Sequence, residues 1–332
     1  MTINEIQKVL VKFPRKKDEI FACFPFLIAL SESLPKAEIN IVVEEGCMPA
    51  FSFLPFKVRV FQRPKLKTNL PGTHQFCANL IDIFNIDVYF DLEGSFNSAF
   101  MGFNFRAKER VGYEEGWNKY LLNRKYPAMP SLDLESRSLL LLEKFLNQQF
   151  NDLKIYVRKD SSKPDDKLEA LFTAPEAPKF ILVMLNDFHS VVKEVEIWKQ
   201  FFDCFENQNF IVYAESNQNA ISEILHKMDT KNKLYMHYGE DYQVLKYLLS
   251  KVSGVVTNNL WAEGLSSFYG VDVVSLLEKA ETYPVYQYFR YKPNRVFHDK
   301  KKLEIFRNAL GEEKSIAEVN QLVDEMHLLF KL

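Results

Sequence analysis

The chain has 332 residues, of which 47% are hydrophobic, so it is long enough to form two domains with separate cores. Lys and Arg (42) nearly balance Asp and Glu (44), which argues against nucleic acid as a partner and confines any basic patch to a local surface. The four cysteines are scattered and the histidines do not cluster, so we expect free thiols in a reducing cytosol and no metal site. The first ten residues lack the features of a signal peptide, and no run approaches the ~20 apolar residues that span a bilayer.

Short apolar runs alternate with longer amphipathic stretches along the whole chain. This alternation is typical of βαβ units and predicts an α/β protein with parallel sheets. In the first half the predicted strands and helices, in chain order, are a strand over 8–13, a helix over 20–34, strands over 39–43, 58–61, 88–91 and 110–112, and a helix over 135–149.

The segments 159–167 and 174–178 are polar and contain proline, which is typical of a domain boundary. We therefore predict a first domain over 1–165, a linker over 166–178 and a second domain over 179–332. The second domain is predicted to contain strands over 180–185, 210–214 and 233–238, helices over 194–206, 217–227 and 242–252, and a strand, turn, helix and strand over 255–274. A capping box at Ser315–Glu318 opens a last helix over 315–332, which we expect to pack back on the first domain.

Two segments of the first half bear on function. The strand at 9–12 is followed by a basic loop and by Asp18-Glu19-Ile20, and the strand at 87–91 runs into Leu-Glu-Gly-Ser. In this order they resemble the heptosyltransferase family, glycosyltransferase family nine, in which a Gly-Asp pair opens the first helix and a later strand ends in Asp-Leu-Gln-Gly. The segments 106–113 and 289–297 resemble two further motifs of that family, and Lys17 stands where the family has glycine.

The resemblance implies a GT-B architecture: two Rossmann-like domains with parallel sheets that face each other across a cleft, with the acceptor on the first and a nucleotide sugar on the second. Such folds bind ligands at the carboxyl ends of their strands. It further implies Asp18 as the general base of an inverting sugar transfer and Lys193 as the cation that stabilises the departing diphosphate. Asp18 sits in a locally basic loop at the predicted start of a helix, and the alternative interpretation is a helix-capping aspartate.

The segment 255–274 aligns with the donor-binding segment of the family, and its polar residues are replaced. Asn259 occupies the aspartate position, Leu260-Trp261 the Thr-Gly pair, and Gly264 the histidine position, with Glu263 adding a negative charge. Backbone N–H groups at the helix start still offer a phosphate site, with Asn186 in the neighbouring loop. Trp261 is either a core residue or a platform for a sugar or base.

The acceptor side is expected to include Arg15, Lys16 and Lys17 from the basic loop, and Glu93 and Ser95 from the second loop. With Lys12, and with Lys65 and Lys67, the basic loop could form a patch for peripheral contact with a membrane; the alternative is a solvated charged loop.

These observations give two hypotheses for the function. The first is a metal-independent glycosyltransferase that transfers a hexosyl or heptosyl group, without a cofactor, from a nucleotide sugar, ADP-linked if family-like, to a lipid-linked or other surface glycan acceptor of the lipopolysaccharide type. The second is a degenerate, non-catalytic relative that binds a glycan or a protein. In either case we expect a monomer in the cytoplasm, with peripheral contact at the inner face of the membrane.

Overall fold

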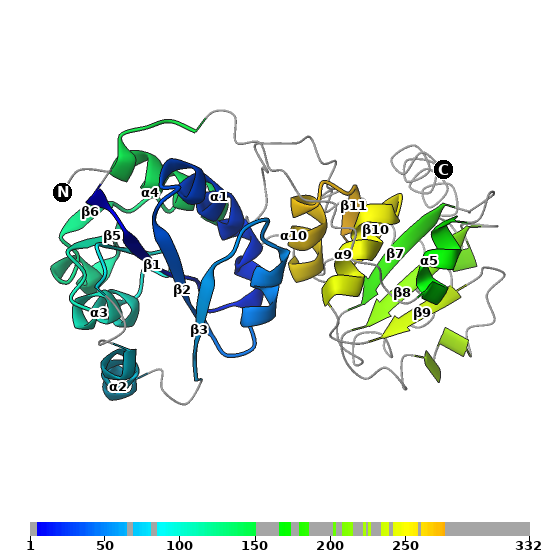
Figure 1. Cartoon of the computed structure of the whole chain (residues 1–332), viewed down its shortest axis with the longest axis horizontal. Helices are drawn as coiled ribbons and strands as arrows, with labels where there is room; N and C mark the ends of the chain where they lie inside the picture. The colour runs from blue at the N-terminus through cyan, green and yellow to red at the C-terminus, as the bar shows by residue number, and fades with distance from the viewer. Residues whose placement is uncertain are drawn as a thin grey trace, which may run out of the picture. The chain divides into compact units, whose positions relative to one another are not determined.

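The computed structural model describes residues 5–64, 69–80, 85–150, 166–173, 179–185, 202–203, 208–214, 222–223, 225–226, 234–238, 242–257 and 260–275. The chain divides into two compact units, the first formed by Met1–Val157 and Pro284–Tyr291 and the second by Arg158–Tyr283 and Lys292–Leu332. Each unit contains one parallel sheet (Figure 1). The prediction of an α/β protein with parallel sheets is therefore confirmed.

The sheet of the first unit has six strands in the order β3-β2-β1-β4-β5-β6. The strands are β1 (Lys8–Lys12), β2 (Glu38–Glu44), β3 (Arg59–Arg63), β4 (Val88–Asp91), β5 (Glu109–Glu114) and β6 (Arg124–Pro127). All neighbouring pairs are parallel. The central strands read as nearly continuous apolar runs because both of their faces are covered.

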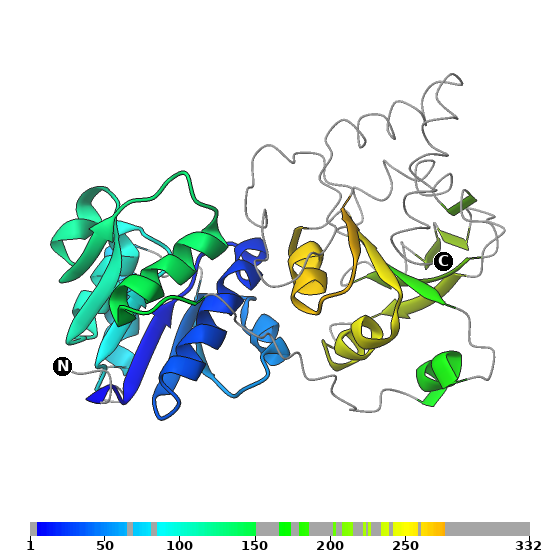
Figure 2. The ribbon, with the colours of Figure 1, turned by 90° about the horizontal axis from the view of Figure 1, so that it is seen from above.

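Two pairs of helices cover the two faces of this sheet (Figures 1 and 2). Tyr89 of β4 lies in a core cluster with residues of α2 (Leu70–Leu80) and α3 (Phe96–Asn104). The next residue, Phe90, points to the other face, where its ring packs edge-on against Phe26 of α1 (Phe24–Ser33) and Phe145 of α4 (Leu134–Leu146). The alternation of side chains along one strand thus builds two cores.

The first long helix starts later than the sequence predicts. The segment between β1 and α1 forms two short 3-10 turns, η2 (Lys17–Glu19) and η3 (Phe21–Cys23), and α1 begins only at Phe24. Pro25 stands in its first turn, where a missing N–H costs nothing. The predicted helix over 20–34 is therefore wrong at its start. The predicted helix over 135–149 ends early, at Leu146, because Asn147 adopts a left-handed conformation with φ 52°.

The sheet of the second unit has five strands in the order β11-β10-β7-β8-β9. They are β7 (Phe180–Leu185), β8 (Asn209–Ala214), β9 (Leu234–Tyr238), β10 (Gly254–Thr257) and β11 (Val273–Ser275). The helices α9 (Tyr242–Lys251) and α10 (Leu260–Phe268) flank β10 in sequence. In both units the strand order reverses next to the first strand, which makes both sheets Rossmann-like.

The predicted linker over 166–178 contains a helix, α5 (Asp166–Thr173). Phe172 of this helix packs edge-on against Phe180 of β7 and Tyr247 of α9. Since these aromatic contacts fix α5 to the second unit, that part of the linker prediction is wrong. The predicted last helix over 315–332 and the segment 289–297 lie outside the described residues, and no helix of the described part has the length and apolar character needed to cross a membrane.

We predict that Gly102→Ala destabilises the first unit. A Cβ atom on Gly102 of α3 would contact the ring of the fully buried Tyr89, 2.7 Å from its Cε1 atom. The Tyr89 hydroxyl donates to the Ser98 carbonyl at 2.7 Å, which hinders the ring from moving aside. Overpacking of this kind costs about 1–3 kcal/mol, measurable by urea denaturation.

The matched control is Gly112→Ala, whose nearest neighbour would be a flexible Leu122 methyl group at 3.0 Å. We expect this variant to lose less stability than Gly102→Ala. Equal losses from the two variants would contradict the role given to Tyr89.

Candidate functional site

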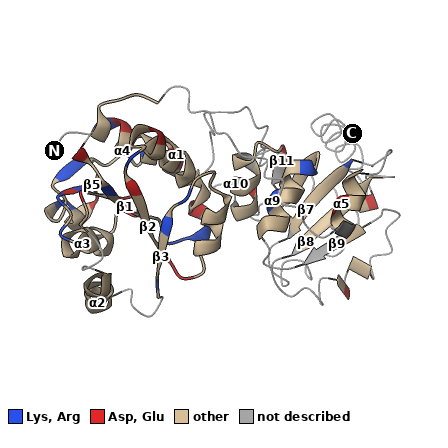
Figure 3. Ribbon diagram, in the orientation of Figure 1, with Lys and Arg blue, Asp and Glu red and all other residues tan. Residues whose placement is uncertain are grey.

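Four neighbouring strands of the first unit each end in a charged residue. They are Lys12 on β1, Glu44 on β2, Arg63 on β3 and Asp91 on β4. Parallel pairing brings these carboxyl ends to one edge, with Glu44 opposite Arg63 and Lys12 opposite Asp91. Charges of both signs accordingly colour this sheet in Figure 3. The edge includes the position between β1 and β4 where the strand order reverses, which is where open α/β sheets bind ligands.

The charged side chains at this edge form a buried ion cluster, made of Lys12, Glu44, Arg63 and Glu93. The Lys12 ammonium lies 3.1 Å from Glu44 Oε1 and 2.9 Å from Glu93 Oε2, and it donates to the Phe13 carbonyl at 2.8 Å. Arg63 donates to both oxygens of Glu44, at 2.6 and 3.3 Å. The side chains of Lys12 and Arg63 are fully buried. Two cations and two carboxylates balance, which is the condition for keeping charges out of water.

The ion cluster continues into the loop between β4 and α3. Arg15 donates to Glu93 Oε1 at 2.7 Å, and the Ser95 hydroxyl donates to the same oxygen at 2.6 Å. Ser95 is also the N-cap of α3, where its hydroxyl accepts from the Ser98 N–H. Glu93 thus joins the loop that follows β1 to the loop that follows β4, so the two loops predicted to form the acceptor side do meet.

The backbone conformation of this loop favours glycine at position 94. The φ of Gly94 is 77°, in the left-handed region that side-chain-bearing residues rarely adopt. The turn lets the N–H groups of Gly94 and Glu93 donate to Asp91 Oδ1 at 2.9 and 3.1 Å, while the Ser98 hydroxyl donates to Oδ2 at 2.9 Å. Asp91 therefore organises the loop.

The two carboxyl groups of the loop are tuned in opposite directions. Burial raises the pKa of Asp91 from 3.8 to about 7, although hydrogen bonds from the Gly94 N–H and Ser98 act against it. Burial also acts to raise the pKa of Glu93, but the charge of Lys12 and the hydrogen bond from Ser95 outweigh it, and the net pKa is lowered. One site thus holds a carboxyl group that titrates near neutral pH beside one that stays ionised, a pattern common at functional sites.

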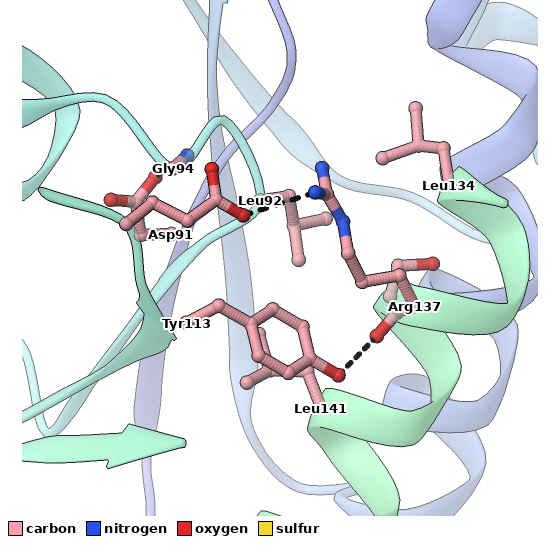
Figure 4. Close-up of a pocket in the computed structure, with 9 residues that line it drawn as sticks. Asp91, Leu92, Gly94, Tyr113, Leu134, Arg137 and Leu141 are labelled. Carbon is pink, nitrogen blue, oxygen red and sulfur yellow. Dashed lines mark hydrogen bonds and ion pairs between the residues drawn. The ribbon is translucent and has the colours of Figure 1, made fainter. Parts of the chain in front are cut away.

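A pocket opens beside Asp91 at the carboxyl ends of β4 and β5 (Figure 4). Tyr113 and Arg137 face each other there, and the Tyr113 hydroxyl donates to the Arg137 carbonyl at 2.8 Å. The Arg137 guanidinium donates to Glu115 Oε1 at 3.0 Å. The remaining lining residues are Leu92, Gly94, Leu134, Ser138 and Leu141. The pocket has a volume of only about 10 Å³, room for about one water molecule, and its hydroxyl and guanidinium groups are paired with other lining groups, so it is too small for a substrate.

Asp18 lies in η2, a single turn after the loop that Arg15 anchors. The residue that caps this turn is Lys16, and α1 begins six residues after Asp18. The prediction that Asp18 stands at the start of a long helix is therefore wrong, because the 3-10 turns over 17–19 and 21–23 precede α1. Asp18 lies within the basic loop, with Lys16 exposed and 3.5 Å from Glu19 Oε1. Its role as a base stays a prediction.

The predicted membrane patch on the basic loop needs a correction. Lys12 is fully buried in the ion cluster, so it contributes nothing to a surface. Arg15 has 46% of its side chain exposed but is paired with Glu93. Lys65 and Lys67 lie outside the described residues.

In the second unit the donor segment has the predicted form of strand, helix and strand, with Leu260 as the first residue of α10. Trp261 is 1% exposed and its ring packs edge-on against Tyr242, and Glu263 is fully buried. A buried indole offers no face to a sugar or base, so Trp261 is a core residue here. Gly264 lies inside the same helix, while Asn186, Lys193 and Asn259 lie outside the described residues.

Four residues of the site were not predicted from the sequence: Glu44, Arg63, Tyr113 and Arg137. For Glu44 and Arg63 a signal existed, because each is a charged residue that ends an apolar strand, in Ile-Val-Val-Glu and Val-Phe-Gln-Arg. The sequence pattern of α4 places Arg137 on the polar face of the helix, and only the packing of α4 against β5 shows that it belongs to the site.

The described residues contain no group of three or more His, Cys, Asp or Glu side chains suited to a metal ion, and metal independence stays a prediction.

We predict that Lys12→Met lowers the free energy of unfolding by about 3–5 kcal/mol, because it leaves the carboxylates of Glu44 and Glu93 buried with one cation fewer. Urea denaturation followed by circular dichroism measures the loss. Lys16→Met is the control, since its exposed ion pair with Glu19 is worth at most about 1 kcal/mol. Similar losses from the two variants would refute the role of the ion cluster.

We predict that Asp91 makes stability depend on pH. Its pKa is raised in the folded state, so its contribution is complete below pH 3.8 and is lost as the pH rises through about 7. Asp91→Asn should remove from the pH profile of unfolding a slope of up to about 1.4 kcal/mol per pH unit between these values. Burial acts to raise the pKa of Asp87, but hydrogen bonds from Lys108, Gln7 and Lys8 lower it overall, so Asp87→Asn should leave this range unchanged. An unaltered profile for Asp91→Asn would contradict the prediction.

The chain is similar to known proteins in its three-dimensional structure. No family model and no curated protein matches the sequence. A family 9 glycosyl transferase from Veillonella parvula aligns with a TM-score of 0.72 at 14% identity, covering 99% of this chain and 98% of that one. The E. coli heptosyltransferase WaaC, solved with ADP-2-deoxy-2-fluoro heptose, aligns at 0.64 with 14% identity over 81% and 88% of the chains. E. coli ADP-heptose lps heptosyltransferase II aligns at 0.61 with 16% identity over 92% and 98%. The resemblance inferred from the sequence is thus confirmed in the fold: the chain has the GT-B architecture of the family 9 glycosyltransferases.

Proposed function

We propose that this protein is an inverting glycosyltransferase that uses a nucleotide sugar. The observation that carries the proposal is the place of the candidate residues in a fold shared with glycosyltransferases. Asp18 follows β1 and the loop from Asp91 to Ser98 follows β4, the two strands between which the order of the sheet reverses. In the second unit α10 follows β10, which pairs with β7 at the corresponding reversal.

In the proposed reaction Asp18 accepts the proton of an acceptor hydroxyl. The hydroxyl oxygen then forms a bond to the anomeric carbon of the donor sugar, and the bond from that carbon to the diphosphate breaks, which inverts the configuration. The pair of Arg15 and Glu93 ties the loop before Asp18 to the buried ion cluster. This support favours a fixed backbone for the base, as a catalytic group requires.

The donor diphosphate would bind at the first turn of α10, where the backbone N–H groups of Leu260 and its neighbours and the helix dipole attract negative charge. Lys193 would stabilise the departing diphosphate, with Asn186 and Asn259 beside it. Trp261 and Glu263 act through the packing of α10, because both are buried. An ADP-linked hexose or heptose is the first donor to test, since the E. coli relative by fold was solved with ADP.

On the acceptor side we propose a lipid-linked or other surface glycan of the lipopolysaccharide type. Arg15, Lys16 and Lys17 would meet its acidic groups, and Glu93 and Ser95 would shape the neighbouring loop. The reaction would need neither metal nor cofactor and would take place at the cytoplasmic face of the membrane, with the protein as a monomer.

One observation favours the second candidate function, a non-catalytic protein that binds a glycan or a protein partner. The helix start that aligns with the diphosphate-binding turn carries Leu260-Trp261, and the buried Trp261 contributes core packing there instead of a polar group. Nucleotide binding separates the two candidates.

We predict that one nucleotide sugar among ADP-, UDP- and GDP-linked sugars raises the melting temperature selectively, because a ligand at about 100 times its Kd adds roughly 2.7 kcal/mol of stability. Differential scanning fluorimetry and isothermal titration calorimetry measure this. No rise in the melting temperature with any of these nucleotide sugars would favour the non-catalytic candidate.

With the donor found, Asp18→Asn should lower kcat by about 10²–10⁴-fold, the usual contribution of a general base, and leave the Kd of the nucleotide unchanged. Glu19→Gln, a neighbouring carboxylate paired with Lys16, is the matched control and should keep kcat near that of the parent. Full activity of Asp18→Asn would refute Asp18 as the base.

A further inference from the structure

Four large apolar side chains of the first unit are exposed on α3 and on the turn η6 (Gly116–Tyr120). They are Phe96 (41% exposed), Phe103 (53%), Trp117 (74%) and Tyr120 (70%), and we call them the aromatic patch. Exposure of one such ring is ordinary, whereas four in two touching elements mark a surface with a partner.

The two elements that carry the four rings are in contact with each other. Phe96 and Phe103 lie seven residues apart on α3, on the stripe opposite the buried Met101 and Phe105. On η6 the rings of Trp117 and Tyr120 lie 5.9 Å apart.

Two polar links hold η6 against the α3 side. The buried Asn118 of η6 donates to the carbonyl of Gly94, just before α3, at 3.0 Å. Arg110 stands 5.9 Å from the centre of the Phe103 ring and donates to the Leu121 carbonyl, just after η6, at 2.7 Å. The middle of η6 and the residue that follows it are therefore held near α3.

The charge around the aromatic patch is positive. Residues 95–127 contain six Lys and Arg residues against three Glu residues, a net charge of +3. Ion pairs join Glu109 to Arg124, Glu114 to Lys125 and Glu115 to Arg137, and Lys108 pairs with Asp87. The net positive charge is therefore carried by the other three cations of the stretch, Arg106, Arg110 and Lys119. The Lys119 ammonium lies over the Tyr120 ring, 5.3 Å from its centre.

We propose that the aromatic patch docks this protein on an anionic lipid surface. Trp and Tyr rings with a polar edge, beside lysine and arginine, suit the headgroup layer of a bilayer, and phenylalanine suits the acyl boundary just below it. A protein partner could pack on the same rings, but the net charge of +3 would attract it only if its surface were acidic. The surface replaces the basic loop after β1, whose Lys12 is buried, as the site of membrane contact.

The position of the aromatic patch also suggests how a lipid-linked acceptor reaches the site. This suggestion rests on the proposed function, whereas lipid docking itself does not. The link from Asn118 to Gly94 puts η6 directly beside the loop that carries Asp91 and Glu93. The glycan of a lipid could therefore reach the carboxyl edge of the sheet while the lipid itself stays in the membrane.

The test uses the full chain and co-flotation with vesicles of phosphatidylcholine alone or mixed equally with phosphatidylglycerol. We expect binding to the mixed vesicles, a loss of at least about tenfold in Trp117→Ser/Tyr120→Ser, and a loss of about fivefold in Lys119→Gln confined to the anionic vesicles. Met48→Ser, which removes an exposed apolar side chain (49%) from η4 (Met48–Phe53) after β2, is the matched control and should bind as the parent does. Since all these side chains are exposed, the melting temperatures should stay equal.

A second readout locates the contact. Lipids brominated on the acyl chain should quench part of the tryptophan fluorescence, and that part should be absent from Trp117→Phe while the other two tryptophans remain. Parental vesicle binding by Trp117→Ser/Tyr120→Ser, or no binding of the parent to the mixed vesicles, would overturn the proposal. Asp18→Asn should bind vesicles normally, so failure of lipid docking and failure of the proposed transfer chemistry give different results.

Discussion

The contact on which the first unit depends is the buried Lys12 ammonium between the carboxylates of Glu44 and Glu93. It joins the ends of β1 and β2 to the loop after β4, and Arg63 extends it to β3 through Glu44. Buried charges of this kind cost desolvation energy and are seldom the cheapest way to stabilise a sheet. Their value here is positional, because each partner fixes the exit of one strand at the edge where ligands bind in such folds.

From this cluster the arrangement of the candidate site follows. Glu93 also binds Arg15 and Ser95. The same carboxylate therefore positions both the loop that leads to Asp18 and the start of α3. Asp91, with its pKa near neutrality, closes the loop through the N–H groups that the left-handed Gly94 presents. The second unit differs in character: the side chains of Trp261 and Glu263 at the start of α10 are buried, so these two residues could meet a diphosphate only through the backbone.

Much of the fold was accessible from patterns in the sequence. Apolar runs located the strands β1, β2, β4, β7 and β10, and ordered motifs identified the GT-B architecture that the solved structures share. Glu93 and Ser95 were found because they lie in a loop with a recognisable motif. The start of α1 was missed, since the apolar residues of η3 run directly into those of α1 and the turn differs from an α-helix only in its hydrogen bonds. The helix α5 was missed because it has few apolar residues, and Phe172 is held by Phe180 and Tyr247, which no local pattern links to it.

By itself the sequence determined the class of fold, the order of the strands along the chain and the loops that carry Asp18 and Glu93, because periodicity and motifs are local properties. The tertiary structure alone decided which charges are buried together. Lys12 reads as one more member of a basic run, and it becomes the centre of an ion cluster only when parallel pairing brings Glu44 and Glu93 to its ammonium group. Trp261 likewise became a core residue, and Trp117 an exposed one, through packing. Burial depends on neighbours distant in sequence, and no local pattern contains them.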